Sequence, residues 1–119
     1  MVKVLLVDDD EDLLEMVTLM LTANNFQVES LPRGDLLFDA IEAQTPDILL
    51  MDVFLGDSDG RQLCRQLKSS HTYAGFPIFL YSAADISNAS FKESNADFFL
   101  RKPFNMTELV NNIYERVKK

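Results

Sequence analysis

The stretch VLLVDDD, residues 4–10, decides the fold because a short apolar run ends directly in a cluster of acids. Three later runs end in the same way: ILLM (48–51) at Asp52, IFLY (78–81) at Ser82 and FFLR (98–101) at Lys102. Short apolar runs separated by helix-like stretches are typical of buried parallel strands, and open parallel sheets bind ligands beyond the carboxyl ends of their strands. We therefore expect the polar groups at these strand ends to meet in one pocket: Asp8, Asp9, Asp52, Ser82 and Lys102.

The composition is that of a small soluble globular protein. A length of 119 residues fits one domain, and a hydrophobic content of 47% is enough for a buried core. No segment approaches the ~20 apolar residues that a membrane span needs, and the N-terminus lacks the apolar core of a secretory signal. We therefore expect a single domain over residues 1–119, located in the cytoplasm and without a membrane partner.

The net charge and the cysteine content narrow the range of possible functions. A net charge of −8 and a pI near 4.4 disfavour direct nucleic-acid binding, because phosphate backbones attract basic surfaces. Any DNA-directed output would therefore pass through a partner. Cys64 is the single cysteine, which excludes an internal disulfide, and its place beside Leu63 predicts helix packing.

Apolar periodicity and breaker residues predict strands that alternate with helices. The expected strands are residues 2–7, 26–31, 48–51, 78–81 and 98–101. The first expected helix runs from an Asp10 cap to about Ala23. Two more should contain Leu37–Ile41 and Leu63–Leu67, and a weak helix should lie within residues 85–95. The last should begin at an Asn105 cap, with Glu108 three residues later. The first helix should bury Leu13, Val17, Met20 and Leu21. This alternation predicts a three-layer α/β sandwich with right-handed crossovers.

The predicted pocket has the composition of a site for a phosphoryl group and a metal ion. Three carboxylates close together cannot all stay ionised without a cation, and Mg²⁺ prefers oxygen ligands. Asp52 is the best candidate nucleophile, because a carboxylate can attack phosphorus and form an acyl phosphate. Asp8 and Asp9 would hold the metal. Lys102 would pair with a phosphoryl oxygen or with Asp52, and the hydroxyl of Ser82 would donate to another oxygen.

Other polar residues near these strand ends have simpler interpretations. Asp10 is expected to cap a helix, and Asp57 and Asp59 are expected to serve a turn and a helix start, since the loop lacks the remaining ligands of a calcium site. His71 has no second His or Cys to form a nitrogen or sulfur site. We interpret it as a surface residue.

These motifs resemble those of the receiver domains of two-component response regulators, the chemotaxis-regulator type of flavodoxin-like fold. The matching segments are VDDD (7–10), DILLMD (47–52) with Asp59-Gly60, Ser82-Ala83, and KPF (102–104). The resemblance covers nearly the whole chain. It implies a five-stranded parallel sheet in the order 2-1-3-4-5, flanked by five helices.

The resemblance also implies a function. Asp52 would receive a phosphoryl group from a sensor histidine kinase or a histidine phosphotransfer protein, with Mg²⁺ held by Asp9, Asp52 and the backbone carbonyl of Phe54, and Asp8 acting through a water. Ser82 and Phe99 would be switch residues that alter the surface of the fourth helix, fifth strand and fifth helix for a downstream protein target or effector domain. The chain would catalyse only its own phosphorylation and dephosphorylation.

Several positions depart from the common pattern of that family. Phe99 lacks the hydroxyl of the more frequent tyrosine, and the segment between Ser82 and Lys102 is slightly shorter than usual. Gly56 stands where proline is usual, which should loosen the loop after Asp52. Phe54 is bulky for a place that borders the path of hydrolytic water, and slow loss of the phosphoryl group is one consequence.

Three other readings remain open from the sequence. Asp8 and Asp10 form an Asp-x-Asp pair as in haloacid-dehalogenase enzymes, although no acidic pair ends a later strand. A non-phosphorylated interaction module would keep the fold without the chemistry. A flavin-binding protein of similar topology would need a Ser/Thr/Gly-rich loop after the first strand, which is not present.

Overall fold

The computed structural model describes residues 1–71, 73 and 75–117, and its centre is one parallel sheet. Five strands lie in the order β2-β1-β3-β4-β5, which confirms the expected topology. The strands are β1 (Lys3–Val7), β2 (Gln27–Leu31), β3 (Ile48–Asp52), β4 (Ile78–Ser82) and β5 (Phe98–Arg101). All neighbouring pairs are parallel, so the carboxyl ends of the strands lie at one edge of the sheet.

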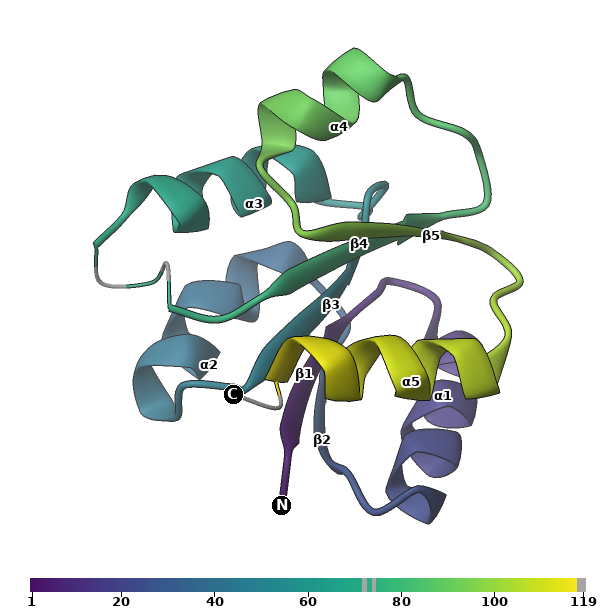
Figure 1. The fold of residues 1–119 in the computed structure, drawn as a ribbon. Helices are drawn as coiled ribbons and strands as arrows, with labels where there is room; N and C mark the ends of the chain where they lie inside the picture. Colours follow the sequence, from purple (N-terminus) through teal and green to yellow (C-terminus); the bar gives the residue numbers. More distant parts are fainter. Residues whose placement is uncertain (72, 74, 118–119) are drawn as a thin grey trace.

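Helices cover both faces of this sheet and form the outer layers of the predicted sandwich (Figure 1). They are α1 (Glu11–Ala23), the short 3₁₀ helix η1 (Gly34–Leu36), α2 (Leu37–Ala43), α3 (Gly60–Ser69), α4 (Asn88–Ser94) and α5 (Met106–Val117). The helices α1 and α5 pack on one face, and α2 and α3 pack on the other, with α4 beside α3.

The sheet has a core on each side, which explains the long apolar runs in its three central strands, β1, β3 and β4. In β1, Val4 and Leu6 pack toward α1 and α5, whereas Leu5 and Val7 pack toward α2 and α3. Side chains of a strand alternate between faces, so a strand covered on both faces needs an apolar residue at every position. All five residues of β1, β3 and β4 are buried.

The predicted helix caps are present. The side chain of Asp10 accepts the N–H of Leu13 at 3.2 Å, and the side chain of Asn105 accepts the N–H of Glu108 at 3.0 Å. Asp59 caps α3 in the same manner. Each carboxylate or amide oxygen satisfies a backbone donor that the first helical turn leaves without a partner. Asp10 and Asp59 therefore have the structural roles that we expected for them.

The buried face of α1 differs from the prediction at Leu13, Leu14 and Met20, and Leu13 is only partly buried. Met20 was expected in the core but is 39% exposed, and Leu14 is buried instead, at 7%. Leu14, Val17 and Leu21 follow one helical face, and this face packs on the sheet.

Several element boundaries also differ from the prediction. β3 and β4 end at Asp52 and Ser82, each one residue later than expected. β1 and β2 begin at Lys3 and Gln27, each one residue later than expected, although Phe26 is still buried. The helix α4 begins at Asn88, because the side chain of Ser87 accepts the N–H of Ser90 at 3.0 Å and starts the helix there.

Cys64 and His71 have the passive roles that we predicted. Cys64 is fully buried, and burial raises the pKa of its thiol to about 12. His71 is exposed in a turn. Among the helices formed by the described residues, none is both long enough and apolar enough to cross a bilayer.

Candidate functional site

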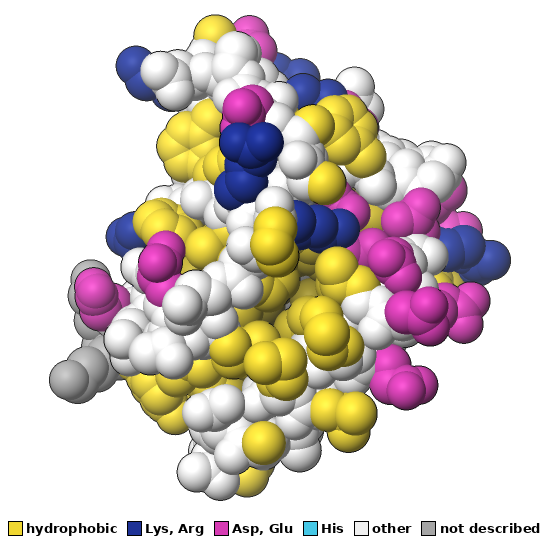
Figure 2. Space-filling model, turned by 90° about the vertical axis from the view of Figure 1, so that its right-hand side faces the viewer, with side chains coloured by type: hydrophobic (Ala, Val, Ile, Leu, Met, Phe, Trp, Pro, Cys, Tyr) yellow, Lys and Arg dark blue, Asp and Glu magenta, His cyan; other side chains and the backbone are white. Residues whose placement is uncertain are grey.

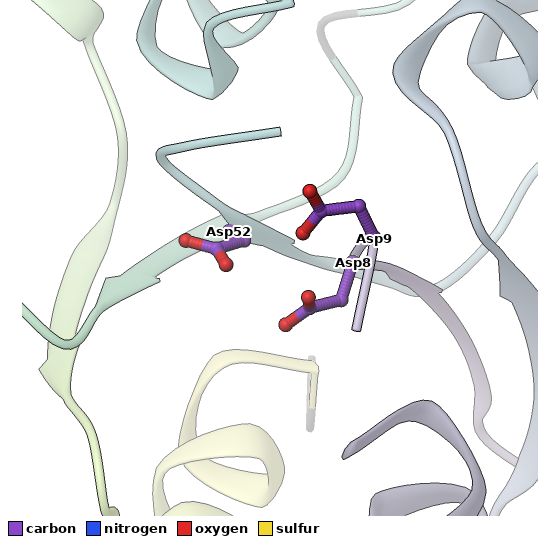
Figure 3. A group of neighbouring side chains, drawn as sticks. All are labelled: Asp8, Asp9 and Asp52. Carbon is purple, nitrogen blue, oxygen red and sulfur yellow. The ribbon is translucent and has the colours of Figure 1, made fainter. Parts of the chain in front are cut away.

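Three carboxylates meet at the carboxyl edge of the sheet, as predicted (Figure 3). Asp8 and Asp9 follow β1, and Asp52 is the last residue of β3, which is hydrogen-bonded to β1. One oxygen from each carboxylate lies within 4.8 Å of the others. Asp8 is fully buried and Asp52 is 6% exposed, whereas Asp9 is exposed.

Lys102 joins two of these carboxylates. Its Nζ lies 3.1 Å from Oδ2 of Asp52 and 3.2 Å from Oδ2 of Asp8. Burial alone lowers the pKa of Lys102, but the hydrogen bond to Asp52 and the charge of Asp8 outweigh it, so the pKa is raised. Lys102 is therefore a fixed positive charge, and we refer to Asp8, Asp9, Asp52 and Lys102 as the acidic site.

The backbone around Lys102 brings its side chain to this position. Its N–H donates to the carbonyl of Ser82 at 2.9 Å, which continues the pairing of β5 with β4 past the last strand residue. The following peptide bond, to Pro103, is cis.

Two hydrogen bonds hold the carboxylate of Asp52, and the pKa of this carboxylate is shifted. Its Oδ1 accepts the N–H of Phe54 at 3.1 Å, and its Oδ2 accepts Lys102. Burial raises the pKa of Asp52 and the charge of Asp8 raises it further, against the hydrogen bond from Lys102, so the pKa is raised overall. The two hydrogen bonds therefore do not fully offset the cost of burying this charge.

Tyr81 is a contact of the acidic site that the sequence reasoning missed. Its hydroxyl donates to Oδ2 of Asp8 at 2.9 Å, and burial, followed by the charge of Asp8, raises its pKa well above the ordinary value. In the sequence, Tyr81 is read only as the last residue of the apolar run 78–81. The sequence did contain one indication of this contact: the hydroxyl of Tyr81 comes just before Ser82, in a strand that was predicted to end at the pocket.

The loop between β3 and α3 is closed by hydrogen bonds. Leu55 and Ser58 exchange two backbone hydrogen bonds, at 3.1 and 3.3 Å, around Gly56. The carboxylate of Asp57 accepts the N–H groups of Gly34 and Asp35 at 3.0 and 2.9 Å, which ties the loop to η1. These bonds hold the turn although Gly56 stands where proline is usual in the family. The expected loosening of the loop concerns its motion and stays a prediction.

Gly60 is required where this loop enters α3. A Cβ at Gly60 would overlap the backbone carbonyl of Asp52, and the N–H of Gly60 donates to the carbonyl of Val53 at 2.8 Å. A residue without a side chain therefore lets α3 begin directly against the strand end that carries Asp52.

Of the two predicted switch residues, Ser82 lies beside Lys102 of the acidic site, and Phe99 lies within β5; neither is part of the site's ionic contacts. Ser82 ends β4, is 1% exposed, and its Oγ accepts the N–H of Ala84 at 3.1 Å. A hydroxyl that accepts in one bond still has an O–H to donate. Phe99 is partly buried against the core between the sheet and α2 and α3.

The donor set suits a hard divalent cation. Three carboxylates face one ammonium, so negative charge is in excess, and all the candidate side-chain ligands are oxygens. Mg²⁺ takes one or two carboxylates and keeps other positions for water and phosphate oxygens. The same charge pattern also fits phosphoryl transfer, in which the phosphoryl oxygens need neutralisation.

A model of the family described as "Response regulator receiver domain" matches residues 4–114. The chain belongs to this family. Receiver domains act in two-component signalling, where their partners are histidine kinases or phosphotransfer proteins.

This receiver domain is also similar to curated response regulators. It is 35% identical over 112 residues to the transcriptional regulatory protein GltR of Pseudomonas aeruginosa, covering 92% of this chain and 46% of GltR. It is 31% identical over 119 residues to the DNA-binding response regulator MtrA of Mycobacterium tuberculosis, covering 98% of this chain and 51% of MtrA. The chain thus spans about half the length of these relatives.

Solved receiver domains have the same fold. The BeF3-activated receiver domain of Klebsiella pneumoniae RstA superposes with a TM-score of 0.87 and 26% identity, covering 98% of this chain and 99% of that chain. The receiver domain of the sensor histidine kinase PA1611 from Pseudomonas aeruginosa, which has magnesium coordinated in its active-site cleft, superposes with a TM-score of 0.87 at 23% identity, covering 98% of both chains.

Proposed function

We propose that Asp52 is the phosphoacceptor of this receiver domain. The observation that carries the proposal is the position of its carboxylate, at the end of β3, bonded to Lys102 at 3.1 Å and grouped with Asp8 and Asp9. An oxygen of Asp52 attacks the phosphorus of a phosphohistidine, the P–N bond breaks, and the imidazole leaves with the bonding electrons. The product is an aspartyl phosphate on Asp52.

The residues around Asp52 have separate roles in this reaction. Lys102 pairs with a phosphoryl oxygen, and the hydroxyl of Ser82 donates to another. Asp8, Asp9, Asp52 and the backbone carbonyl of Phe54 would hold Mg²⁺. When bound, Mg²⁺ neutralises negative charge on the transferring phosphoryl group. The oxygen-only donor set and the excess of negative charge support this assignment.

The signal would leave the site through Ser82 and Phe99. Movement of these residues would change the surface of α4, β5 and α5, where the downstream target or effector domain binds. The helix α4 has only seven residues, and its sequence contains two serines, so little intrinsic helix stability opposes repacking. Outside this self-modification the domain would have no enzymatic activity.

The donor protein would dock next to Lys102. A groove there is lined by Leu13, Met16, Val17 and Met20 of α1 and by Pro103, Phe104 and Met106 after β5. Figure 2 shows hydrophobic side chains around this hollow, with acidic side chains gathered to one side of it. Because Ala83 and Lys102 also line the groove, a histidine kinase or phosphotransfer protein bound there would present its phosphohistidine to the acidic site.

Direct binding of nucleic acid by this chain is not part of the proposal. MtrA is a DNA-binding response regulator, but the chain spans 51% of its length and has a net charge of −8. We infer that any effect on DNA depends on a partner or an attached effector domain.

Intact-mass analysis after incubation with Mg²⁺ and acetyl phosphate tests the proposal. The wild type should gain one phosphoryl group, Asp52→Asn should gain none, and chelation of Mg²⁺ should prevent the gain. Asp57→Asn is the matched control, because this exposed loop carboxylate accepts the N–H groups of Gly34 and Asp35 and is not one of the three grouped carboxylates, and it should react like wild type. A wild type that gains no mass would favour the non-phosphorylated interaction module.

The same experiment separates the proposal from a haloacid-dehalogenase mechanism. That mechanism needs Asp8 as nucleophile and Asp10 as its partner, but Asp10 caps α1. Loss of modification in Asp8→Asn with retention in Asp52→Asn, together with steady release of phosphate from small esters, would overturn the assignment of Asp52.

A further inference from the structure

Tyr81 contacts two charged residues of the acidic site, Asp8 and Lys102. Its hydroxyl lies 2.9 Å from Oδ2 of Asp8 and 3.3 Å from the carbonyl of Val7. Its ring lies under the ammonium of Lys102, with Nζ 5.1 Å from the ring centroid. Both Tyr81 and Asp8 are fully buried, so water cannot replace the hydroxyl as a donor without a rearrangement.

The orientation of the Asp8 carboxylate depends on three donors. Its Oδ1 accepts the N–H of Asp10 at 2.8 Å, and its Oδ2 accepts Tyr81 and Lys102. The bond from Asp10 fixes one oxygen only. Lys102 also contacts Asp52 at 3.1 Å, so its bond to Asp8 is not exclusive. The hydroxyl of Tyr81 is therefore the donor that holds the second oxygen of Asp8 independently of Asp52.

A phenol suits this position because it is a neutral donor. Its hydroxyl donates to a lone pair of the buried carboxylate, and leaving that lone pair without a hydrogen bond would cost free energy. Because the phenol is neutral, it does not cancel the negative charge that attracts a cation. Its ring is itself fixed, since it packs edge-on against Phe104 with centroids 5.4 Å apart. The face of the ring also favours an ammonium above it.

We propose that Tyr81 is a positioning residue of the acidic site, which fixes the carboxylate of Asp8 and the ammonium of Lys102 and thereby sets the affinity for a divalent cation. This rests on the proposed function, in which Asp8 helps to hold Mg²⁺. Groups that orient metal ligands through hydrogen bonds commonly change metal affinity by about 10–100-fold when they are removed.

Calorimetric titration of the metal-free protein with Mg²⁺ tests the proposal without any phosphodonor. Tyr81→Phe removes the hydroxyl and keeps the ring, and it should bind Mg²⁺ roughly tenfold more weakly than wild type. Tyr114→Phe is the matched control, because Tyr114 is 43% exposed and packs on Phe26 away from the site. It should bind Mg²⁺ like wild type.

A dissociation constant for Tyr81→Phe within twofold of wild type would overturn the role of Tyr81 alone, even if the variant were less stable. A wild type that binds no Mg²⁺ would instead overturn the proposed metal site and this inference with it. A second measurement is urea unfolding of the metal-free variants Tyr81→Phe, Asp8→Asn and their combination. If Tyr81 acts through Asp8, the two effects are less than additive, whereas additive effects would contradict the proposal.

Discussion

Replacing Lys102 by Met would remove the ammonium that lies between Asp8 and Asp52. The two ionic contacts are 3.2 and 3.1 Å long, and at an effective dielectric constant near 20 each attraction is about 5 kcal/mol before desolvation is subtracted. Breaking a buried ion pair by removing one partner costs about 3–5 kcal/mol. Because the side chain of Lys102 keeps 18% exposure, we expect the lower value, about 3 kcal/mol of unfolding free energy.

The loss should depend on pH in the metal-free protein. Burial already raises the pKa of Asp52 above 3.8, and without Lys102 its repulsion by Asp8 is uncompensated, so the pKa rises further. A carboxyl with a raised folded-state pKa stabilises the fold while it is protonated, and this stabilisation is lost as pH rises through that pKa. The deficit of Lys102→Met should therefore be larger at pH 7 than at pH 5.

Urea unfolding followed by far-ultraviolet circular dichroism, with a chelator present, measures this deficit. Lys92→Met is the matched control, because Lys92 is exposed on α4, and it should change the unfolding free energy by less than about 0.5 kcal/mol. Added Mg²⁺ should restore part of the stability of Lys102→Met. A loss of unfolding free energy that is under about 1 kcal/mol and equal at both pH values would refute the reasoning. It would mean that these contacts are no stronger than ordinary surface ion pairs.

Three further substitutions probe the same region by urea unfolding without metal. Asp52→Asn should be more stable than wild type at pH 7, because burial raises the pKa of Asp52 and its ionised form is unfavourable, and this gain should disappear as pH falls toward 4. Gly60→Ala should lose about 1–3 kcal/mol, since its Cβ would overlap the backbone of Asp52, whereas Gly75→Ala meets nothing within 4 Å and should be neutral. Asp57→Ala should lose less than about 1 kcal/mol at neutral pH, because water screens this exposed carboxylate; the hydrogen bond from Gly34 lowers the pKa of Asp57, so the loss should vanish as pH falls below 3.8. Equal stability of wild type and variant at pH 7 would contradict the first and third expectations.

The acidic site could be predicted from the sequence because parallel strands leave little freedom at their ends. Once residues 4–7 and 48–51 are read as neighbouring strands, Asp8 and Asp52 must emerge at the same edge of the sheet. The same reasoning places Lys102, whose strand ends beside Ser82. The apolar runs alone therefore determine which polar groups meet.

The details that could not be predicted depend on tertiary contacts. On α1, both Leu14 and Met20 are apolar, and only the packing angle of the helix on the sheet decides that Met20 stays exposed. At the start of α4, Asp85 forms an ion pair with Arg101 at 2.8 Å instead of joining the helix. The hydroxyl of Tyr81 in β4 reaches Asp8, which follows β1, across the intervening strand β3, and no local pattern encodes this contact.

The phenol beside Asp8 also gives this domain an optical probe of its own. The chain has no Trp, three Tyr and nine weakly emitting Phe, so tyrosine dominates its near-ultraviolet emission. A carboxylate that accepts the hydroxyl proton quenches a phenol in its excited state, and Tyr81 is bonded to Asp8 in this way. Occupation of the pocket by a cation should brighten that emission, so the natural sequence can report the loading of its own site without any attached dye.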